Sequence, residues 1–382
     1  MKNIYYWSPC LSKVGTYRST INSAVSLAKY SKNLYTVTLI NACGEWDEKK
    51  DFLKKNNIEV FDLGLNYYRF LPKEGFLGSR LSYLLIILLS IIPLINLLKK
   101  NSSEFFVVHL VTSLPLILFY IFNFNSKLIL RISGFPKLNL FRKKLWSVLS
   151  NKIYKCTCPS IDLMKQLINL KMFSEKKLLF LPDPIININE YINNLRMSYN
   201  SKIDVPKEKF FISVGRLTKQ KNFKYLINEF SNFSIDNDDF RLLIFGSGEQ
   251  KEYLNNLIRK NKMENKIFLM GHSNNVFFYM KKAEAFLLTS LWEDPGFVLI
   301  ESALCNLPII SSDCKNGPKE FLKDGQAGML YTSDKSGELK KSLKIFLNQK
   351  SEMSIKKILA KKNCLNYTLF RHYKIFNEVL KS

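Results

Sequence analysis

Short apolar runs alternate with segments of helical length along almost the whole chain, and this alternation limits the possible folds most. It predicts β-α-β units, because parallel neighbouring strands need a long crossover that a helix usually supplies. In the first half, the expected strands are Asn3–Trp7, Leu34–Ile40, Ile58–Phe61, Phe105–Leu110, Leu128–Ile132, Cys156–Pro159 and Leu178–Leu181. In the second half, they are Phe210–Val214, Leu242–Phe245, Ile267–Met270, Ala285–Thr289 and Pro308–Ser311. The sequence therefore predicts an α/β protein with two parallel sheets.

The clearest interruption of this pattern is Pro182-Asp183-Pro184, which a polar stretch over residues 200–209 follows. A chain of 382 residues is also longer than one ordinary core requires. We expect an N-terminal domain at 1–183, a C-terminal domain at 184–365 and a last helix at 366–382 that packs back on the first domain. Two doubly wound domains that face each other leave a cleft at the carboxyl ends of their strands, where ligands bind.

The chain carries 57 Lys and Arg residues against 32 Asp and Glu residues, a net charge of +25. This charge favours anionic partners, which include nucleic acid, anionic lipid and phosphorylated small molecules. For most of the lysines, a solvated surface is the simpler interpretation. The cations are dispersed and match no nucleic-acid-binding module, so we expect no nucleic-acid partner.

The seven cysteines show no disulfide framework in their spacing, and Cys156 and Cys158 form a C-x-C without a second pair. The chain has only three histidines, so we expect no structural zinc site. The opening residues MKNIYYWSPC hold an apolar run too short for a secretory signal. These features predict reduced, mainly buried thiols and a cytoplasmic location.

Residues Leu81–Leu98 are almost entirely apolar and reach the lower length limit for a membrane span. Ser90, Pro93 and Asn96 interrupt the run, so a buried or interfacial helix is favoured over a spanning one. Leu138–Lys155 mixes aromatic and aliphatic residues with cations, which suits both an anionic membrane surface and an ordinary surface helix. We expect peripheral attachment to the inner face of the cytoplasmic membrane.

The segment FFISVGRLTKQKN places Gly215, Arg216 and Lys221 between a strand and a helix that opens near Asn222. A helix N-terminus favours negative charge, the Arg216 fork suits phosphate, and Lys221 adds a point charge. The segment therefore predicts a diphosphate site, although two exposed cations in a lysine-rich protein would look the same.

Two further strand ends carry candidate residues. Gly246 and Gly248 directly follow a strand, which indicates either close approach of a nucleotide or a plain tight turn. Glu293 lies in the next such loop, and Glu301 follows in a mostly apolar helix. A buried carboxylate needs partners, and the two hydroxyls of a ribose would satisfy Glu301. A Pro-Gly turn between the two glutamates strengthens this interpretation.

Together GRLTKQKN, FGSGEQ, the two glutamates of EDPGFVLIE and NGPKEFLKDGQAGML resemble the retaining glycosyltransferases of family 4. The resemblance is close over Phe210–Leu330 and looser over the first half. It implies the GT-B fold, with two Rossmann-like doubly wound domains that face each other across a cleft. The first domain would bind the acceptor and the second the nucleotide-sugar donor.

The resemblance also implies roles for residues that match its motifs in the second half. Arg216 and Lys221 would bind the donor diphosphate, Glu301 the ribose, and Glu293 the donor sugar. The remaining donor-binding positions act through their backbone or close packing, and they are Gly215, Gly246, Gly248, Gly296 and Phe297. Gly317 and Glu320 match a further turn of the family, without an assigned role.

In the first half, His109 follows the run FFVV, where family members often carry a histidine that reaches the transferred sugar. A histidine satisfied within the core is the equal alternative. The loop Leu11–Thr16 occupies the place of a glycine-rich loop near the diphosphate, but only Gly15 is present where the family often has two glycines. The strand end Arg131–Pro136 also resembles a cleft-facing segment.

The chemistry expected from these residues needs no metal and no cofactor, since the nucleotide-sugar is a substrate. Asp236-Asn237-Asp238 has the spacing of a metal-binding D-x-D, but it precedes a strand and is expected to be a solvated turn. Arg216, Lys221 and helix N-termini would stabilise the leaving diphosphate instead.

The predicted function is retaining transfer of a hexose or N-acetylhexosamine from a nucleotide-sugar, with UDP favoured. The acceptor would be a lipid-linked glycan or a polysaccharide in bacterial surface glycan synthesis. The alternative is a catalytically inactive GT-B subunit at the membrane.

Overall fold

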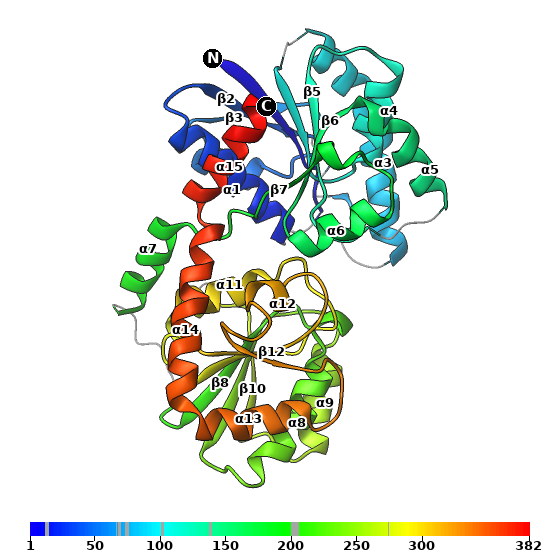
Figure 1. Ribbon diagram of the computed structural model, residues 1–382. Coiled ribbons are helices and arrows are strands. Elements are labelled where there is room, and N and C mark those ends of the chain that lie inside the picture. The colour runs from blue at the N-terminus through cyan, green and yellow to red at the C-terminus, as the bar shows by residue number, and fades with distance from the viewer. Residues whose placement is uncertain are drawn as a thin grey trace. The chain divides into compact units, whose positions relative to one another are not determined.

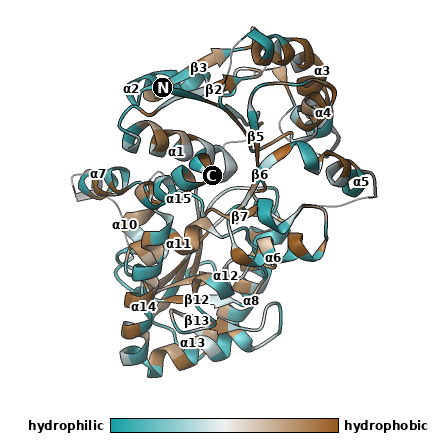
Figure 2. Cartoon of the chain, turned by 45° about the horizontal axis from the view of Figure 1, so that its top comes forward, coloured by the Kyte–Doolittle hydropathy of each residue, from teal (hydrophilic) through white to brown (hydrophobic). Residues whose placement is uncertain are grey.

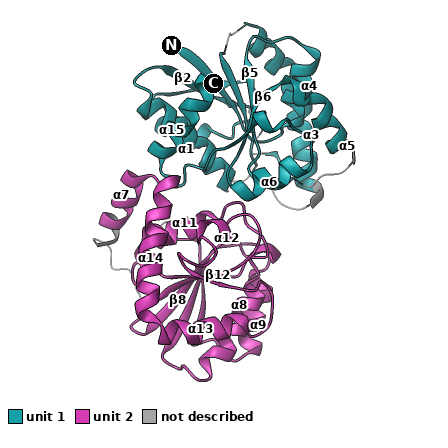
Figure 3. Cartoon of the chain, in the orientation of Figure 1, with its two compact units in different colours: residues 1–185, 367–382 teal, residues 186–366 magenta. Residues whose placement is uncertain are grey.

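The computed structural model describes residues 1–11, 15–65, 67, 70–72, 76–100, 103–136, 140–199, 206–273 and 275–382. The chain divides into two compact units (Figure 3). Unit 1 comprises residues 1–185 and 367–382, and unit 2 comprises residues 186–366. The chain leaves unit 1 just after the Pro182-Asp183-Pro184 interruption and returns to it for the last segment.

The described residues of unit 1 form one parallel sheet of seven strands: β1 (Lys2–Trp7), β2 (Tyr35–Asn41), β3 (Ile58–Asp62), β4 (Phe105–Val108), β5 (Lys127–Arg131), β6 (Ile153–Cys158) and β7 (Leu178–Phe180). Their order is β3-β2-β1-β4-β5-β6-β7 (Figure 1). The sheet is therefore doubly wound, and its switch point lies between β1 and β4, where Trp7 pairs with Val108.

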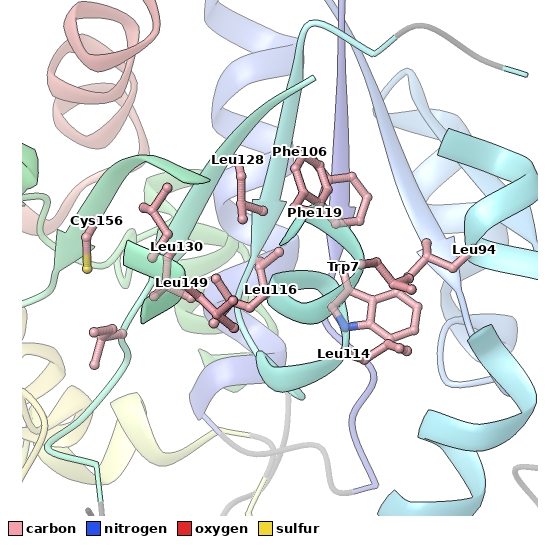
Figure 4. Packing of buried hydrophobic residues seen from close by; sticks show 14 of the residues in the cluster. Trp7, Leu94, Phe106, Leu114, Leu116, Phe119, Leu128, Leu130, Leu149 and Cys156 are labelled. Atoms are coloured by element: carbon pink, nitrogen blue, oxygen red, sulfur yellow. The ribbon is translucent and has the colours of Figure 1, made fainter. Parts of the chain in front are cut away.

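Helices cover both faces of this sheet, and their bounds are α1 (Gly15–Tyr30), α2 (Lys50–Lys55), α3 (Phe76–Lys100), α4 (Ser113–Ile121), α5 (Leu140–Leu149), α6 (Ile161–Asn169) and α15 (Leu369–Lys381). Successive residues of a strand point to opposite faces, so each strand contributes to two apolar clusters. Trp7 and Phe106 pack in the cluster that includes Leu94 of α3 (Figure 4). Tyr6 and Val107 pack in the cluster that includes residues of α1 and α15.

The helix α3 has one buried and one exposed apolar face. Ile86 and Leu94 are fully buried, whereas Leu88 is 55% and Ile92 70% exposed. The stretch Gly78–Lys100 is long and apolar enough to cross a membrane, but 33% of its most apolar 18-residue window is buried inside the protein. Figure 2 shows α3 and its neighbour α4 as strongly hydrophobic ribbons. The helix thus packs on the sheet and exposes an apolar stripe.

One predicted helix is shorter than expected. Of the basic segment Leu138–Lys155, α5 ends at Leu149, and β6 begins at Ile153. Ile153 is buried in the sheet, where it pairs with Leu128 of β5, so this part of the segment forms a strand instead of continuing the helix.

A buried polar network joins α15 to the rest of unit 1. His372 donates from Nδ1 to the Pro182 carbonyl at 2.7 Å. Its Nε2 accepts from the Ser23 hydroxyl at 2.9 Å, and Tyr6 donates to Ser23 at 2.9 Å. Burial, reinforced by the Arg131 charge, lowers the pKa of His372 to about 3. The imidazole is therefore neutral and its tautomer is fixed by its partners.

The described residues of unit 2 form one parallel sheet of six strands: β8 (Lys209–Val214), β9 (Phe240–Phe245), β10 (Ile267–Gly271), β11 (Ala285–Leu288), β12 (Ile309–Ser312) and β13 (Met329–Tyr331). Their order is β10-β9-β8-β11-β12-β13, so this sheet is also doubly wound, with its switch point between β8 and β11.

The helices of unit 2 are α7 (Ile188–Tyr199), α8 (Phe223–Ser234), α9 (Lys251–Lys260), α10 (Val276–Met280), α11 (Phe297–Leu304), α12 (Pro318–Phe321), α13 (Glu338–Asn348) and α14 (Lys350–Cys364). Phe211 of β8 lies at the centre of the core and stacks on Phe240 with 5.0 Å between ring centroids. Phe230, Phe233 and Phe346 meet the same ring at edge-on angles. This aromatic packing anchors the strand whose end carries the candidate site.

Candidate active site

The loops that follow β8 and β11 are joined at the switch point of unit 2. Thr289 Oγ1 donates to the Lys221 carbonyl at 2.9 Å. The Leu291 N–H donates to the Gln220 carbonyl at 2.9 Å, and the Gln220 amide donates to the Trp292 carbonyl at 2.9 Å. The two loops therefore form one surface at the sheet edge where doubly wound folds bind ligands.

An ion pair connects these loops through their side chains. Lys221 Nζ lies 2.5 Å from Glu293 Oε1, and the two side chains are only 13% and 5% exposed. Ser290 Oγ donates to the same carboxylate oxygen at 2.5 Å. A pair this deep costs desolvation, which its short contacts and extra hydrogen bond offset. The site thus holds a cation and a carboxylate in fixed positions.

The two cations of the β8 loop differ in their surroundings. The Lys221 side chain passes over Gly215, where an added Cβ would lie 3.1 Å from Lys221 Cδ and Cε. Arg216, the neighbour of Gly215, is exposed. The sequence predicted that both Arg216 and Lys221 bind the diphosphate; the structure places Lys221 in a buried ion pair and leaves Arg216 exposed.

Gly246 and Gly248 are required by packing between loops. An added Cβ at Gly246 would lie 1.9 Å from the Gly215 carbonyl oxygen, and one at Gly248 would lie 2.5 Å from the Leu217 carbonyl oxygen. The Leu217 N–H also donates to the Ser247 carbonyl at 2.9 Å. Of the two interpretations of these glycines, the structure provides direct grounds for a close turn, which braces the loop that carries Arg216 and Lys221.

The helix α11 begins directly after the Pro295-Gly296 turn. Gly296 occupies the N-cap position in a left-handed conformation, and Phe297 is the first helical residue. A helix start directs backbone N–H groups and partial positive charge toward this edge. Glu301 lies one turn into the helix and is 6% exposed. Gly317 packs so tightly on this turn that an added Cβ would lie 2.2 Å from the Pro295 carbonyl oxygen.

The two candidate residues of the first half belong to unit 1. His109 follows β4 at the switch point, and its backbone N–H donates to the Trp7 carbonyl at 2.9 Å. His109 is 3% exposed, and burial together with the Arg131 charge holds its pKa well below 6.5. Gly15 is the first residue of α1, while positions 12–14 of the predicted glycine-rich loop lie outside the described residues.

The sequence did not indicate the role of Ser290, nor the partner of Arg131, although it singled out the strand end Arg131–Pro136. Ser290, which donates to Glu293, directly follows the apolar strand in FLLTS, and its position at the strand end is the signal that was available. Arg131 forms a buried ion pair with Asp183, and Ser19 also donates to that carboxylate. No local pattern joins Arg131 to Asp183, because β5 and the segment after β7 meet only in the folded sheet.

The acidic triplet Asp236-Asn237-Asp238 lies at the surface after α8. Asp236 pairs with Lys344 at 2.8 Å, and Asp238 pairs with Lys266 at 2.5 Å. The hydrogen bond from Lys344 lowers the pKa of Asp236, and the one from Lys266 lowers that of Asp238. Among the described residues, no group of three or more His, Cys, Asp or Glu side chains has an arrangement suited to a metal ion.

Two solved structures share this architecture over the whole chain. A glycosyltransferase of Rickettsia africae ESF-5 has a TM-score of 0.79 at 16% identity, covering 100% of this chain and 98% of that one. Anabaena HepE in complex with UDP has a TM-score of 0.73 at 15% identity, covering 100% of both chains. With the two doubly wound units, these likenesses confirm the predicted GT-B fold.

The family follows from sequence comparisons. Residues 199–362 match the glycosyl transferases group 1. The N-acetylgalactosamine-N,N'-diacetylbacillosaminyl-diphospho-undecaprenol 4-alpha-N-acetylgalactosaminyltransferase of Campylobacter jejuni is 31% identical over 255 residues, covering 60% of this chain and 68% of that protein. The chain belongs to the glycosyl transferases group 1 family and is a glycosyltransferase.

Proposed function

We propose that the protein is a retaining, metal-independent transferase that moves a hexose or N-acetylhexosamine from a UDP-sugar to a lipid-linked or polysaccharide acceptor in bacterial surface glycan synthesis. The observation that carries the proposal is the buried Lys221–Glu293 pair at the switch point of unit 2. UDP is the favoured donor nucleotide because HepE, which has the same fold, is found with UDP. The Campylobacter relative, whose name specifies a diphospho-undecaprenol acceptor, supports the lipid link.

Cleavage of the sugar–diphosphate bond develops negative charge on the leaving phosphate. Arg216 is exposed, whereas Lys221 is held in place by Glu293, whose carboxylate also accepts a hydrogen bond from Ser290. The N-terminus of α11 adds partial positive charge from backbone N–H groups at Gly296 and Phe297. Fixed charges of this kind stabilise a leaving group without rearrangement during the reaction, which is the role a metal has in other transferases.

The carboxylates position the donor in this proposal. Glu301 accepts hydrogen bonds from the two ribose hydroxyls, and Glu293 contacts the donor sugar while orienting Lys221. The His109 imidazole is neutral at neutral pH, so one of its ring nitrogens can accept a hydrogen bond from a hydroxyl of the transferred sugar. Retention follows from attack on the same face as the leaving group, with a donor phosphate oxygen taking the proton of the acceptor hydroxyl.

The acceptor side of the proposal rests on unit 1. The exposed stripe of α3 is flanked by Arg80 and by Lys99 and Lys100, a combination that suits the interface of an anionic membrane. We therefore place the enzyme at the inner face of the cytoplasmic membrane, where lipid-linked glycans are extended.

Thermal unfolding with UDP, GDP, dTDP, ADP and their sugars in the presence of EDTA tests the donor site. A ligand at about 100 times its Kd adds about 2.7 kcal/mol to the free energy of unfolding. We expect this stabilisation with UDP and UDP-sugars for the wild type and for the control Glu264→Ala, which alters an exposed carboxylate. Glu301→Ala should lose most of it.

The same panel separates the alternatives. Stabilisation only when a divalent cation replaces EDTA would contradict metal independence. Stabilisation by no nucleotide would contradict the donor site and would favour the inactive membrane subunit. The anomeric configuration of the first product, followed by proton NMR, decides between retention and inversion.

A further inference from the structure

Of the four tryptophans of the chain, all of which lie among the described residues, only Trp292 has an exposed side chain. Trp7 and Trp46 are fully buried and Trp146 is 4% exposed, whereas Trp292 is 47% exposed. Trp292 directly precedes Glu293 in the loop after β11. An indole is a large apolar surface with one polar atom, and in binding surfaces tryptophan contributes more than most residues. Its exposure beside the candidate donor site therefore needs an explanation.

The backbone of Trp292 is held by the loops that follow β8 and β12. Its carbonyl accepts from the Gln220 side-chain amide at 2.9 Å, and the residue forms a parallel bridge with Lys315. The Glu293 N–H donates to the Lys315 carbonyl at 3.1 Å. The exposed indole is thus presented from a fixed position, which lowers the entropy that a ligand loses in binding to it.

The same bridge defines the side of the loop on which the indole lies. Neighbouring residues of an extended segment point to opposite faces, and residues paired across a bridge point to the same face. Glu293 directs its carboxylate inward to Lys221, so Trp292 lies on the outer face of this loop. Lys315 shares the outer face and is exposed. The loop therefore separates the Lys221–Glu293 pair from an exposed indole.

The Trp292 indole also differs from the buried ones in its contacts. Trp46 stacks on Tyr17 with 4.9 Å between ring centroids, and Trp146 meets Phe173 at 5.7 Å. Among the described residues, no ring packs against Trp292 and no group accepts from its Nε1–H. A flat apolar face with one available donor suits a sugar ring, whose C–H groups pack on the indole while a hydroxyl accepts from Nε1–H.

The charges near this outer face balance each other. Apart from the Lys221–Glu293 pair, the charged residues within two positions of Gln220, Trp292 and Lys315 are Lys219, Lys315, Asp294 and Asp313. Arg216, a further exposed cation of the loop after β8, is assigned to the donor diphosphate in the proposed function. Ammonium groups donate to sugar hydroxyls and carboxylates accept from them, whereas a phosphate would be repelled by the two aspartates. The surroundings favour a neutral ligand rich in hydroxyl groups.

We propose that a neutral sugar ring of the acceptor glycan packs on Trp292, so that unit 2 takes part in acceptor binding through the outer face of the loop that carries Glu293. The inference deepens the proposed function and rests on it, because it names a residue that recognises the acceptor. The inner face of this loop is committed to the donor, through Lys221 and Glu293. The outer face is left for the second substrate.

Collisional quenching of tryptophan emission by iodide tests the proposal, because it reports on exposed indoles. The probes are the methyl glycosides of glucose, galactose, N-acetylglucosamine and N-acetylgalactosamine, each titrated with UDP present to fill the donor site. N-acetylgalactosamine 1-phosphate is the anionic counterpart. We expect at least one glycoside to lower the quenching constant at least twofold, and UDP alone to leave it nearly unchanged. Trp292→Phe should remove most of the quenchable emission, which assigns the signal.

Other patterns of protection would overturn the proposal. Protection by UDP alone would assign Trp292 to the donor side of the loop. Protection by none of the glycosides would show that no sugar covers the indole, and equal or stronger protection by the sugar phosphate would contradict a neutral ligand. Protection by phosphatidylglycerol vesicles and by none of the glycosides would place the indole at a membrane surface.

Calorimetric titration of variants with the protecting glycoside, again with UDP present, measures the contribution of the ring. Trp292→Leu should weaken binding at least tenfold, and Trp292→Tyr, which keeps an aromatic face and a donor, about threefold. Tyr253→Leu is the matched control, because it removes an exposed aromatic ring of α9 that is 46% exposed, and it should change binding less than twofold. Equal effects of Trp292→Leu and Tyr253→Leu would overturn the assignment.

Thermal shifts with UDP on the wild type and on Trp292→Leu separate the two proposals. We expect UDP to stabilise both proteins equally. UDP binding without protection by any glycoside overturns only the role of Trp292. Absence of UDP binding by the wild type contradicts the donor site of the proposed function, whatever the glycosides do.

Discussion

The two units wind their sheets in the same way, with the first strand next to the fourth, but the side chains at the two switch points differ in charge. In unit 2 Glu293 balances the charge of Lys221 just below the surface, so of the two cations expected to bind the diphosphate, Arg216 is the one whose charge is exposed at this edge. In unit 1 the edge presents His109 as a neutral group, and the charge of Arg131 is cancelled by Asp183. The shared topology supplies the position of a site, and the loops after the strands determine which side chains it presents.

The largest expected effect comes from breaking the charged site of unit 2. Lys221→Met should lower kcat with a UDP-sugar by about 10²–10³-fold, because a fixed charge on the leaving diphosphate is lost. It should also destabilise unit 2 by about 3–5 kcal/mol, since Glu293 is left buried without its cation. Steady-state kinetics and urea unfolding measure the two effects.

A double variant separates these effects. Lys221→Met with Glu293→Leu should recover most of the stability, because a buried pair is replaced by apolar groups, but not the activity. Recovery of activity together with stability would show that the pair is only structural.

Breaking the Arg131–Asp183 ion pair of unit 1 should lower stability without weakening UDP binding. Arg131→Met leaves Asp183 buried and unpaired and should destabilise the protein by about 3–5 kcal/mol, with UDP affinity unchanged within twofold. Lys209→Met removes an exposed pair with Asp239 and should cost less than about 1 kcal/mol. A large loss of UDP affinity at constant fold in Arg131→Met would contradict the division of roles between the units.

A methyl group at Gly246 tests the close contact between Gly246 and the Gly215 carbonyl, which supports the loop after β8. Gly246→Ala places a Cβ against the Gly215 carbonyl, so we expect a loss of about 2–4 kcal/mol and weaker UDP binding. Gly271→Ala is the matched control, because this residue also has a positive φ but has open space around it. Its cost should be about 1 kcal/mol, from backbone strain alone. Equal costs for the two variants would show that the loop yields to the added methyl group.

The smallest expected effect is a pH dependence that originates in unit 1. His372 is neutral in the folded protein with a pKa of about 3, whereas an unfolded histidine titrates near 6.5. The unfolded state therefore binds this proton first, and His372 alone lowers the free energy of unfolding by up to about 1.4 kcal/mol per pH unit as the pH falls below about 6.5. His109, whose pKa is also held well below 6.5, contributes in the same direction. Urea unfolding at pH 7.5, 6.0 and 5.0 measures the slope.

Variants assign this slope to its histidine. His372→Gln should reduce it, and His272→Gln, at an exposed position of unit 2, should not. A slope that is unchanged in His372→Gln would show that other groups dominate the acid response.

The strands of the fold were largely predictable because they are short buried apolar runs between polar turns. Among the described strands, the exception is β13 (Met329–Tyr331), whose first two residues end the motif NGPKEFLKDGQAGML and were not assigned to a strand. For α3 the sequence indicated a helix but not its buried side. Nearly every position from Leu81 to Leu98 is apolar, so no periodic contrast distinguishes buried Leu94 from exposed Ile92.

The candidate site was predictable only where its residues are local in sequence. One loop motif contains both Arg216 and Lys221, and a second contains Glu293 and Glu301. That Lys221 pairs with Glu293 while Arg216 stays exposed depends on how the two loops dock. In unit 1 the sequence singled out His109 and the strand end Arg131–Pro136, which line one pocket, but not Leu145 of α5, which joins them only after the helix packs on the sheet.

The return of the chain to unit 1 sets an order for folding during synthesis. Unit 2 is a continuous segment, and all of it has been made once residue 366 has been added. Unit 1 cannot close the core on its α1 face until Leu369, Phe376 and Leu380 of α15 leave the ribosome. Its first 185 residues therefore emerge with an apolar surface that stays open while unit 2 is being translated. Apolar surface exposed in this way is prone to aggregation until α15 has been added.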